Sequence, residues 1–378
     1  MPKTLILTKP IIAVTGSAGK TTTKEMIASV LRRRWRIFAS YRSFNQHTCS
    51  ARNAKRIRPF HRAAVLEFGM GARGQIKKHC KFIQPNMGVI TNVGTAHIGN
   101  VGGNVEGIAK AKSELIKHMK QTGYLVLNAD DPNSKLLETE GFQGTIVRIG
   151  IKNEADFRAK NVGYETDGMS FDVLLDGQVH TFYIPIYGEH NVYNALNAIA
   201  IASRLGFTPE EMKTGLRYYK RTPRRLNIFR YTGNITLIDD SCSANPNAVR
   251  AALDVLKKVS GETKVAVLGT MLAMGKYSTK AHMEVGRYVA STGVDYLYTY
   301  GKRARHIALA AIQAGFSKER VKMFESEQLL RKSIVACLKP NTTILIKASH
   351  KIGLEKTVDY IKKQARLKGL KQLSWKGR

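Results

Sequence analysis

The sequence predicts an α/β protein with two domains: a larger one on a parallel-rich central sheet, then a smaller, doubly wound, Rossmann-like one. Length is the first observation, because 378 residues exceed one typical domain and suit two or three. The second is that β-branched runs alternate with helical patterns in both halves. The third is Pro223 within a charged stretch, which places the boundary between residues 1–221 and 222–378.

Strand and helix patterns alternate along the first half. We expect buried strands over residues 11–14, 63–67, 87–91 and 124–128. Helical spacing predicts helices over residues 22–33, 105–121 and 191–205. Such alternation favours a parallel sheet with helices on both faces. Between residues 155 and 185 the period changes to two, which indicates a small antiparallel excursion.

The second half repeats the alternation. Strands are expected over residues 235–238, 264–268, 296–300 and 343–346. Helices are expected over residues 248–257, 281–291, 304–314 and 326–338. This pattern is typical of an open, doubly wound sheet. The basic tail after Ile361 is expected to fray.

A phosphate-binding loop follows the first predicted strand. Its residues are Thr15, Gly16, Ser17, Ala18, Gly19, Lys20, Thr21 and Thr22. Glycines let backbone N–H groups approach phosphate oxygens, and the N-terminus of the next helix favours an anion. Lys20 is expected to reach the β- and γ-phosphates, and the Thr21 hydroxyl to bind magnesium. Val14 stands where the general pattern has a glycine, yet strand, loop and helix together favour ATP binding over a plain turn.

Lys and Arg outnumber Asp and Glu by 61 to 28, which gives a net charge of +33. This excess favours anionic partners, and nucleic acid is compatible with it. The charge is spread along the chain without a nucleic-acid-binding motif, so a solvated basic surface is an equal alternative. The sequence has four cysteines without metal-type spacing, no apolar run of membrane-spanning length and no signal peptide. We therefore expect a cytoplasmic protein.

Nine stretches together resemble the Mur ligase family, and within it the branch that adds D-alanyl-D-alanine to a UDP-muramoyl tripeptide. They read TGSAGKTTT (15–23), EFGMG (67–71), TNVGTAH (91–97), AKSE (111–114), LNADD (127–131), GEHNVYN (188–194), DDSCSANP (239–246), LGTMLAMG (268–275) and KAS (347–349). The resemblance implies a P-loop ATPase domain followed by a Mur-ligase-type C-terminal domain. It also implies an ADP-forming ligase that joins a carboxylate to an amine through an acyl phosphate, in cell-wall peptidoglycan synthesis.

The resemblance implies two magnesium ions and a catalytic set that includes Lys20. Glu67 resembles the family's acidic metal ligand, and its place after a strand puts it beside the phosphate loop. His97 resembles the ligand of the second metal; from residue type alone, a structural or general-base histidine is the alternative. Lys112 matches a lysine that is carbamylated in relatives, with an ordinary exposed helix lysine as the alternative.

Further residues are assigned to ATP and substrates by the resemblance alone. Asn191 and Asn194 lie three apart on one helix face and correspond to residues that contact adenine. In the second domain, the resemblance assigns Arg225 and Asp240 to closure over the nucleotide. It assigns Asn245 and Lys347, in the same domain, to the substrate side. For each of them, a capping or surface polar group is the alternative.

Departures from the family lie on the acyl and amine sides. The phosphate loop begins within twenty residues of Met1, so we expect the family's N-terminal UDP-sugar domain to be missing or supplied by a partner chain. Thr270 and Ala273 stand where relatives have Asp and Glu, which removes partners for an ammonium group. The basic loop 48–62 is a candidate site for an anionic acyl substrate.

Three functions therefore stay open. The first is a ligase of the D-alanyl-D-alanine-adding type, acting on small carboxylate and amine or peptide substrates. The second is the same chemistry outside the cell wall, for a polyamide, a peptide natural product or a cofactor. The third is a nucleotide-binding protein with a basic anion-binding surface, although Lys20, Glu67 and His97 count against it.

Overall fold

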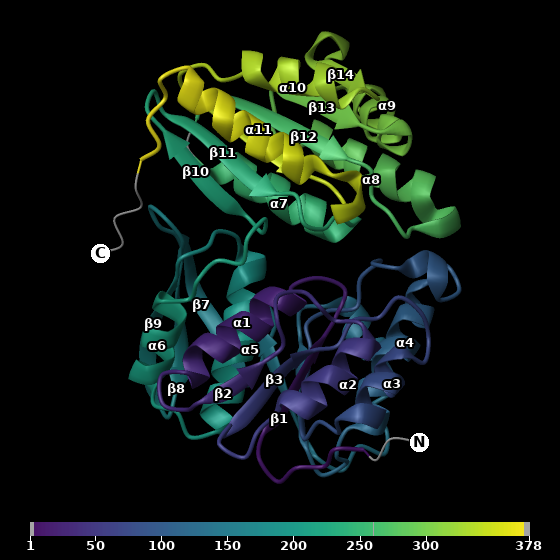
Figure 1. Ribbon diagram of the computed structural model, residues 1–378, viewed down its shortest axis with the longest axis vertical. Helices are drawn as coiled ribbons and strands as arrows, with labels where there is room; N and C mark the ends of the chain where they lie inside the picture. Colours follow the sequence, from purple (N-terminus) through teal and green to yellow (C-terminus); the bar gives the residue numbers. More distant parts are fainter. Residues whose placement is uncertain (1–3, 260, 374–378) are drawn as a thin grey trace. The chain divides into compact units, whose positions relative to one another are not determined.

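A computed structural model describes residues 4–259 and 261–373, and the chain divides into two compact units, residues 1–222 and 223–378. Each unit is a sheet covered by helices (Figure 1). The predicted domain boundary lies one residue before this division. No helix of the described residues is long and apolar enough to cross a membrane.

The N-terminal unit is built on a nine-stranded sheet, in the order β2-β3-β1-β4-β5-β6-β7-β8-β9. Neighbours from β2 to β7 are parallel, and β8 and β9 add an antiparallel hairpin. The strands are β1 (Ile11–Thr15), β2 (Ile37–Ala39), β3 (Ala63–Glu67), β4 (Met87–Ile90), β5 (Tyr124–Asn128), β6 (Thr145–Gly150), β7 (Phe157–Tyr164), β8 (Met169–Leu175) and β9 (Gln178–Ile184).

Helices cover both faces of this sheet (Figure 1). One face carries α1 (Lys20–Leu31), α5 (Glu189–Arg204) and α6 (Pro209–Arg217). The other carries α2 (His47–Arg56), α3 (Gln75–Phe82) and α4 (Val105–His118). Every residue of β1, β3, β4 and β5 is buried, which is why these strands need cover on both sides. The alternating burial of β8 fits a strand with one covered face.

The C-terminal unit has a six-stranded sheet, in the order β10-β11-β15-β12-β13-β14, in which only the β10–β11 pair is antiparallel. Its strands are β10 (Asn227–Tyr231), β11 (Ile235–Asp240), β12 (Thr263–Gly269), β13 (Tyr296–Tyr300), β14 (Val321–Phe324) and β15 (Thr342–Lys347). Its helices are α7 (Pro246–Lys258), α8 (Ser278–Ala290), α9 (Arg305–Gln313), α10 (Glu327–Ala336) and α11 (Leu354–Leu367).

The prediction of two α/β units, each on a parallel-rich sheet, is confirmed, but two local predictions are wrong. The tail does not fray directly after Ile361, because α11 continues to Leu367 with Ile361 and Ala365 buried. Beyond the helix, the Leu373 N–H donates to the Arg230 carbonyl at 2.8 Å. Residues 374–378 of the predicted tail lie outside the described part. The basic stretch 48–62 is not simply a loop, because α2 covers most of its first half.

Candidate functional site

The phosphate loop joins β1 to α1, and the residues after β4 hold it in shape. The Ser17 N–H donates to the Asn92 carbonyl at 3.1 Å, and the Ala18 N–H to Asn92 Oδ1 at 3.0 Å. Thr91 Oγ1 donates to the Ala18 carbonyl at 2.5 Å. Thr91 and Asn92 open the TNVGTAH stretch, where sequence reasoning singled out His97 and missed both of them.

Two positions of the loop require glycine. Gly16 and Gly19 have φ of 145° and 81°, in the region that favours glycine. A Cβ on Gly16 would lie 1.9 Å from Thr91 Oγ1, and one on Gly19 would lie 2.4 Å from Asn194 Oδ1. The loop backbone therefore lies so close to Thr91 and Asn194 that only glycine fits at these two positions. The absence of side chains also lets phosphate oxygens approach the backbone N–H groups.

Lys20, Thr21 and Glu67 meet at the carboxyl edge of the sheet. Lys20 opens α1, and its ammonium donates to the Gly16 carbonyl at 2.8 Å. Thr21 Oγ1 donates to Glu67 Oε2 at 2.8 Å, which places a hydroxyl beside a carboxylate. Asn45 Nδ2 donates to Glu67 Oε1 at 2.7 Å, a contact that the sequence did not indicate. The prediction that Glu67 ends a strand beside the phosphate loop is confirmed.

The described residues fit magnesium held together with a nucleotide rather than by protein alone. They contain no group of three or more His, Cys, Asp or Glu side chains that could hold a metal ion. Magnesium in nucleotide sites takes one or two protein oxygen ligands and completes its shell with phosphates and water. The adjacent oxygens of Thr21 and Glu67 are such a donor set, and the glycine cradle beside them suits the phosphates.

His97 and Lys112 each interact electrostatically with Lys20. His97 precedes the short helix η1 (Ile98–Asn100) and has a left-handed backbone, with φ of 63°. Burial, followed by the charges of Lys20 and Lys112, lowers the pKa of His97 to about 4. A histidine that stays neutral at pH 7 has a lone pair with which to bind a metal ion.

Lys112 lies on α4 and is 1% exposed, so the alternative of an exposed helix lysine is wrong. Burial and then the charge of Lys20 place its pKa well below the ordinary lysine value, against an opposing effect of Asp131. No acceptor lies within hydrogen-bonding distance of its amine among residues 4–259 and 261–373. The Asp131 carboxylate instead accepts the Val93 N–H at 2.6 Å. Lys112 is therefore a buried amine without a hydrogen-bond acceptor, and its charged form is disfavoured.

Asn191 and Asn194 lie on the first turns of α5, as predicted, and both are buried. Their amide groups bind within the protein. Asn194 Nδ2 donates to Asn191 Oδ1 at 2.9 Å, and Thr23 Oγ1 donates to Asn194 Oδ1 at 2.9 Å. Through Thr23, the pair is therefore hydrogen-bonded to α1 just after the phosphate loop. A contact of the two asparagines with adenine stays a prediction.

In the C-terminal unit, the predicted residues gather at the carboxyl ends of β11 and β15. Lys347 is 3% exposed, and its ammonium donates to Asp240 Oδ2 at 2.5 Å and to the Ser243 carbonyl at 2.9 Å. Asn245 Oδ1 accepts the Ala248 N–H at 3.0 Å and caps α7, so the capping alternative holds for its side chain. Arg225 lies just before β10.

The loop after β12 carries the two departures on the amine side, Thr270 and Ala273. It contains no acidic residue between positions 268 and 277. Neighbouring side chains fix its backbone instead: His282 Nε2 accepts the Met271 N–H at 3.0 Å, and Ser349 Oγ accepts the Leu272 N–H at 2.9 Å. The loop is therefore well held but offers no carboxylate of its own to an ammonium group.

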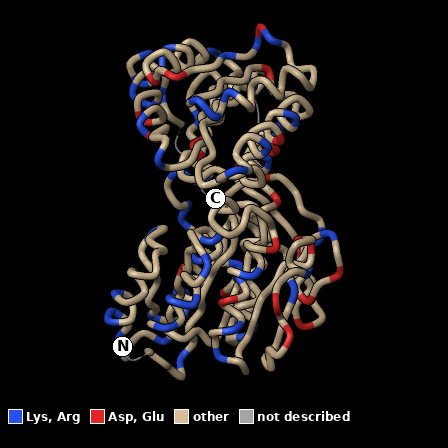
Figure 2. Tube along the Cα trace, turned by 90° about the vertical axis from the view of Figure 1, so that its right-hand side faces the viewer, with Lys and Arg blue, Asp and Glu red and all other residues tan. Residues whose placement is uncertain are grey.

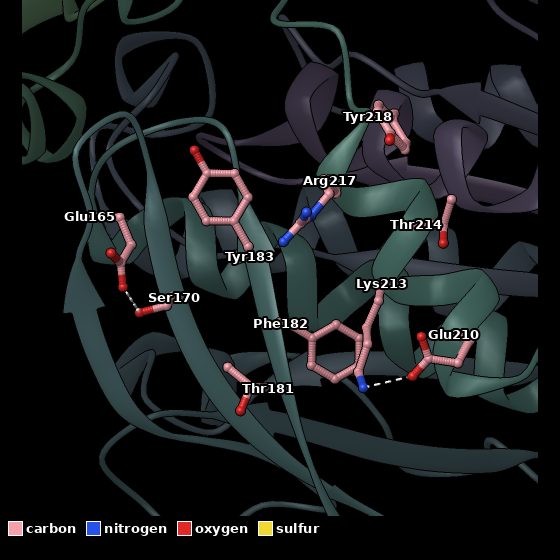
Figure 3. A pocket seen from close by; sticks show the side chains of 10 residues that line it. All are labelled: Glu165, Ser170, Thr181, Phe182, Tyr183, Glu210, Lys213, Thr214, Arg217 and Tyr218. Atoms are coloured by element: carbon pink, nitrogen blue, oxygen red, sulfur yellow. Dashed lines mark hydrogen bonds and ion pairs between the residues drawn. The ribbon is translucent and has the colours of Figure 1, made fainter. Parts of the chain in front are cut away.

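A hollow of about 730 Å³ lies between β8, β9 and α6 (Figure 3). None of the predicted site residues lines it. Its charges are partly satisfied internally, because Lys213 pairs with Glu210 at 2.7 Å and Glu165 accepts from Ser170 at 2.6 Å. The Arg217 guanidinium lies 5.9 Å from the Tyr183 ring centre. The hollow therefore belongs to the hairpin surface and not to the phosphate-loop site.

Counted over each unit as a whole, basic residues outnumber acidic ones (Figure 2). The imbalance is strongest between residues 32 and 62, which include ten Lys and Arg residues and no Asp or Glu. This stretch runs from the end of α1 through β2 and α2 to the start of β3. Asn45, within this stretch, contacts Glu67 at the carboxyl end of β3.

Comparison with known proteins decides the family. The Mur ligase middle domain matches residues 14–202, and the Mur ligase, glutamate ligase domain matches residues 224–350. The chain belongs to the Mur ligase family. The resemblance carried by the nine sequence stretches is thereby confirmed, and the ATP-dependent phosphate-loop unit is the middle domain of such a ligase.

Several relatives of this Mur ligase share one name. The chain is 34% identical to the UDP-N-acetylmuramoyl-tripeptide--D-alanyl-D-alanine ligase of Bacillus subtilis, over 92% of this chain and 75% of that protein. It is 33% identical to the Synechocystis enzyme of the same name, over 94% and 75% of the two chains. A crystal structure of MurF from Acinetobacter baumannii superposes with a TM-score of 0.84 at 29% identity, covering 93% of this chain and 76% of that one.

Proposed function

We propose that this Mur ligase is an ATP-dependent, ADP-forming enzyme that couples D-alanyl-D-alanine to a muramoyl-tripeptide carboxylate in peptidoglycan synthesis. The observation that carries the proposal is the Thr21–Glu67 oxygen pair beside a glycine cradle and Lys20. The names of the relatives supply the substrates, since they describe that coupling. The chain aligns with about three quarters of each relative's length, including both regions that carry the predicted residues.

The chemistry has two balanced steps. A carboxylate oxygen of the acyl substrate attacks the γ-phosphorus of ATP, the bond to the β,γ-bridging oxygen breaks, and ADP leaves. The amine then attacks the acyl carbon, inorganic phosphate leaves, and the amine nitrogen loses a proton to form the amide. Lys20 and the loop N–H groups hold the phosphates in line. Thr21 and Glu67 would hold magnesium, which would offset the negative charge of the phosphates when bound.

A second magnesium is proposed at His97 and Lys112. His97 would offer a neutral ring nitrogen. Lys112 would offer oxygens once its amine has added to carbon dioxide and lost a proton, which gives a carbamate. Burial without a hydrogen-bond partner supports this modification, because only a neutral amine has the lone pair that forms the new N–C bond. Carbamylation would give Lys112 a negative charge and oxygen atoms, and these would let it bind a metal ion together with His97.

For the remaining residues the proposal keeps the assignments implied by the family. Asn191 and Asn194 would lie against adenine while bracing α1. Arg225 and the Asp240–Lys347 pair would act from the C-terminal unit on the nucleotide and the incoming substrate. Asn245 has its side-chain oxygen engaged as a helix cap, so only its remaining amide hydrogens would meet substrate.

The proposal is tested by ADP release from magnesium ATP with a panel of carboxylates and amines. UDP-N-acetylmuramoyl tripeptide with D-alanyl-D-alanine is expected to give release that depends on both. Lys20→Ala is expected to lower kcat by about a hundredfold or more, because one phosphate-positioning cation is lost. Lys110→Ala is the matched control, since Lys110 is an exposed lysine of α4.

Two outcomes would change the assignment. Release that needs a different acid–amine pair would keep the ligase chemistry and move it outside the cell wall. No release with any pair, together with retained ATP binding, would contradict ligase activity and favour a nucleotide-binding protein.

A further inference from the structure

Segment 40–45, which follows β2, is attached at both ends to the carboxyl end of β3. At its start, Ser40 Oγ accepts the Glu67 N–H at 3.0 Å. At its end, Asn45 Nδ2 donates to Glu67 Oε1 at 2.7 Å, and the Asn45 carbonyl accepts the Gly69 N–H at 2.8 Å. The segment therefore borders the carboxylate that is proposed to hold magnesium.

A buried lysine supports the segment from α1. Lys24 is fully buried, and its ammonium donates to the Ser40 carbonyl at 2.6 Å and to the Arg42 carbonyl at 2.7 Å. It is also paired with Glu25 at 2.7 Å. Burying an ammonium costs several kcal/mol of desolvation unless it is well bonded, at order-of-magnitude level. Because the Lys24 ammonium binds two carbonyls of the segment, it fixes the backbone conformation of the segment.

The conformation of Arg42 is itself unusual. Its φ is 47°, in the left-handed region that is unfavourable for a residue with a Cβ. Glycine would adopt this backbone without that cost. Strain of this kind persists where the surroundings fix it, and here Lys24 holds the carbonyl of the strained residue. We therefore infer that the Arg42 side chain has a role that glycine, which has no side chain, could not perform.

The attachments leave three side chains of the segment exposed. Tyr41 is 57% exposed, Phe44 is 60% exposed, and Arg42 lies in the exposed class. The two rings lie 5.7 Å apart, and the Arg42 guanidinium lies 5.1 Å from the Tyr41 ring centre. No carboxylate of the described chain lies within ion-pair distance of Arg42. The result is a cation beside Tyr41, one of two neighbouring exposed aromatic rings, in a segment bonded to Glu67.

We propose that Tyr41, Arg42 and Phe44 bind the acyl substrate, with Arg42 pairing with an anionic group and the rings packing against an adjoining apolar or planar part. The inference rests on the proposed ligase function and names the part of the chain that selects its acid substrate. A planar guanidinium suits a carboxylate or a phosphate, which share the charge and geometry it recognises. Exposed aromatic side chains clustered at a reactive edge are typical of a ligand surface.

The test varies the acyl substrate, UDP-N-acetylmuramoyl tripeptide, at saturating ATP and D-alanyl-D-alanine. Arg42→Gly is the main variant, because it removes the cation and also relieves the left-handed backbone. It is expected to raise the KM for the acyl substrate about tenfold or more, as loss of a charge-assisted hydrogen bond predicts. The kcat and the KM for ATP should stay within about threefold, since Arg42 makes no contact with the phosphate loop. Tyr41→Ala and Phe44→Ala should each give a smaller rise.

Arg148→Gln is the matched control, an exposed arginine of β6 outside the basic stretch 32–62, and it should leave the KM unchanged. Two substrate analogues identify the anion: if the loss in Arg42→Gly disappears when the non-reacting carboxylate is amidated, Arg42 binds that carboxylate. If it disappears with the muramoyl tripeptide lacking the diphosphate, Arg42 binds the diphosphate. An unchanged KM in Arg42→Gly, or an equal rise in Arg148→Gln, would overturn the proposal.

Direct binding separates this proposal from the proposed function. Calorimetric titration of the acyl substrate into the ADP-loaded protein needs no turnover. If wild type binds the substrate and Arg42→Gly binds it at least about tenfold more weakly, the site holds even where no ADP is released. If wild type and Arg42→Gly bind equally, or wild type does not bind at all, the site is refuted whatever the kinetics show.

Discussion

Lys112 and Lys347 are both almost fully buried, at 1% and 3% exposure, and the protein surrounds them in opposite ways. Lys347 has a carboxylate partner, Asp240, at 2.5 Å and a carbonyl as well. Lys112 has no acceptor within hydrogen-bonding distance among the described residues, and the cation Lys20 disfavours its protonation. A paired buried lysine contributes to holding a fold together, whereas a buried lysine whose charged form is disfavoured is available for chemistry.

Of the variants that test this difference between Lys112 and Lys347, Lys112→Met is expected to have the largest effect. Activity should fall by about a hundredfold or more, because the proposed carbamate oxygens are lost from a metal site. The free energy of unfolding should stay unchanged or rise, since an unpaired amine is replaced by an apolar chain of similar length. ADP release and urea unfolding measure the two effects, with Lys110→Met as the exposed control. Strong destabilisation would show that Lys112 is paired after all.

Asp240→Ala is expected to have the next largest effect, this time on stability. Removing the partner of a buried ammonium should lower the free energy of unfolding by about 3–5 kcal/mol. Adding Lys347→Met should recover most of that loss, because no uncompensated charge then remains. Urea unfolding of the two single variants and the double variant gives the coupling. Losses that simply add would show that the two residues do not stabilise each other.

His79 extends the comparison to a buried histidine and has the smallest expected effect. It is fully buried, and its Nε2 donates to the Gly69 carbonyl at 3.2 Å while its Nδ1 accepts from Ser50 at 2.6 Å. Burial lowers its pKa to about 4, so the unfolded chain takes up a proton near pH 6.5 before the folded protein does. Its contribution to stability is therefore complete above pH 6.5 and declines as the pH falls toward 4.

Urea unfolding at pH 8 and pH 5 measures this effect. His79 should account for a loss of about 2 kcal/mol between the two pH values, and His79→Gln should remove that share. His97 also has a pKa of about 4 and adds a decline of the same sign, so His97→Gln serves as the matched variant. An unchanged pH dependence in His79→Gln would contradict the assignment.

The sequence located the phosphate loop and Glu67 because their signal is local. Strand β3 has the predicted bounds because a run of five buried apolar and acidic residues has no competing interpretation. The stretch 48–62 gives no helical signal in the sequence because the buried residues of α2, Ser50 and Asn53, are polar and form no apolar periodicity. The sequence indicates a fraying tail because lysines and arginines surround the few buried apolar residues at the end of α11.

Contacts between distant residues account for what the sequence did not predict in the site. The hydrogen bond from Asn45 to Glu67 joins positions 22 residues apart, and no spacing rule indicates it. The burial of Lys112 depends on the helices and loops that close over α4. The motif around Asn191 and Asn194 placed them on one helix face, but only the fold shows that each satisfies the other.

Helix α1 carries, within five residues, contacts to three separate parts of the N-terminal unit. Lys20 and Thr21 face the phosphate loop and Glu67, Thr23 binds Asn194, and Lys24 binds the carbonyls of segment 40–45. One rigid turn therefore links the nucleotide to the acid-binding segment, so the two ligands should be thermodynamically linked. By reciprocity, whatever factor ATP adds to the affinity for the acid, the acid adds to the affinity for ATP. Such linkage would give the enzyme a preferred order of substrate addition.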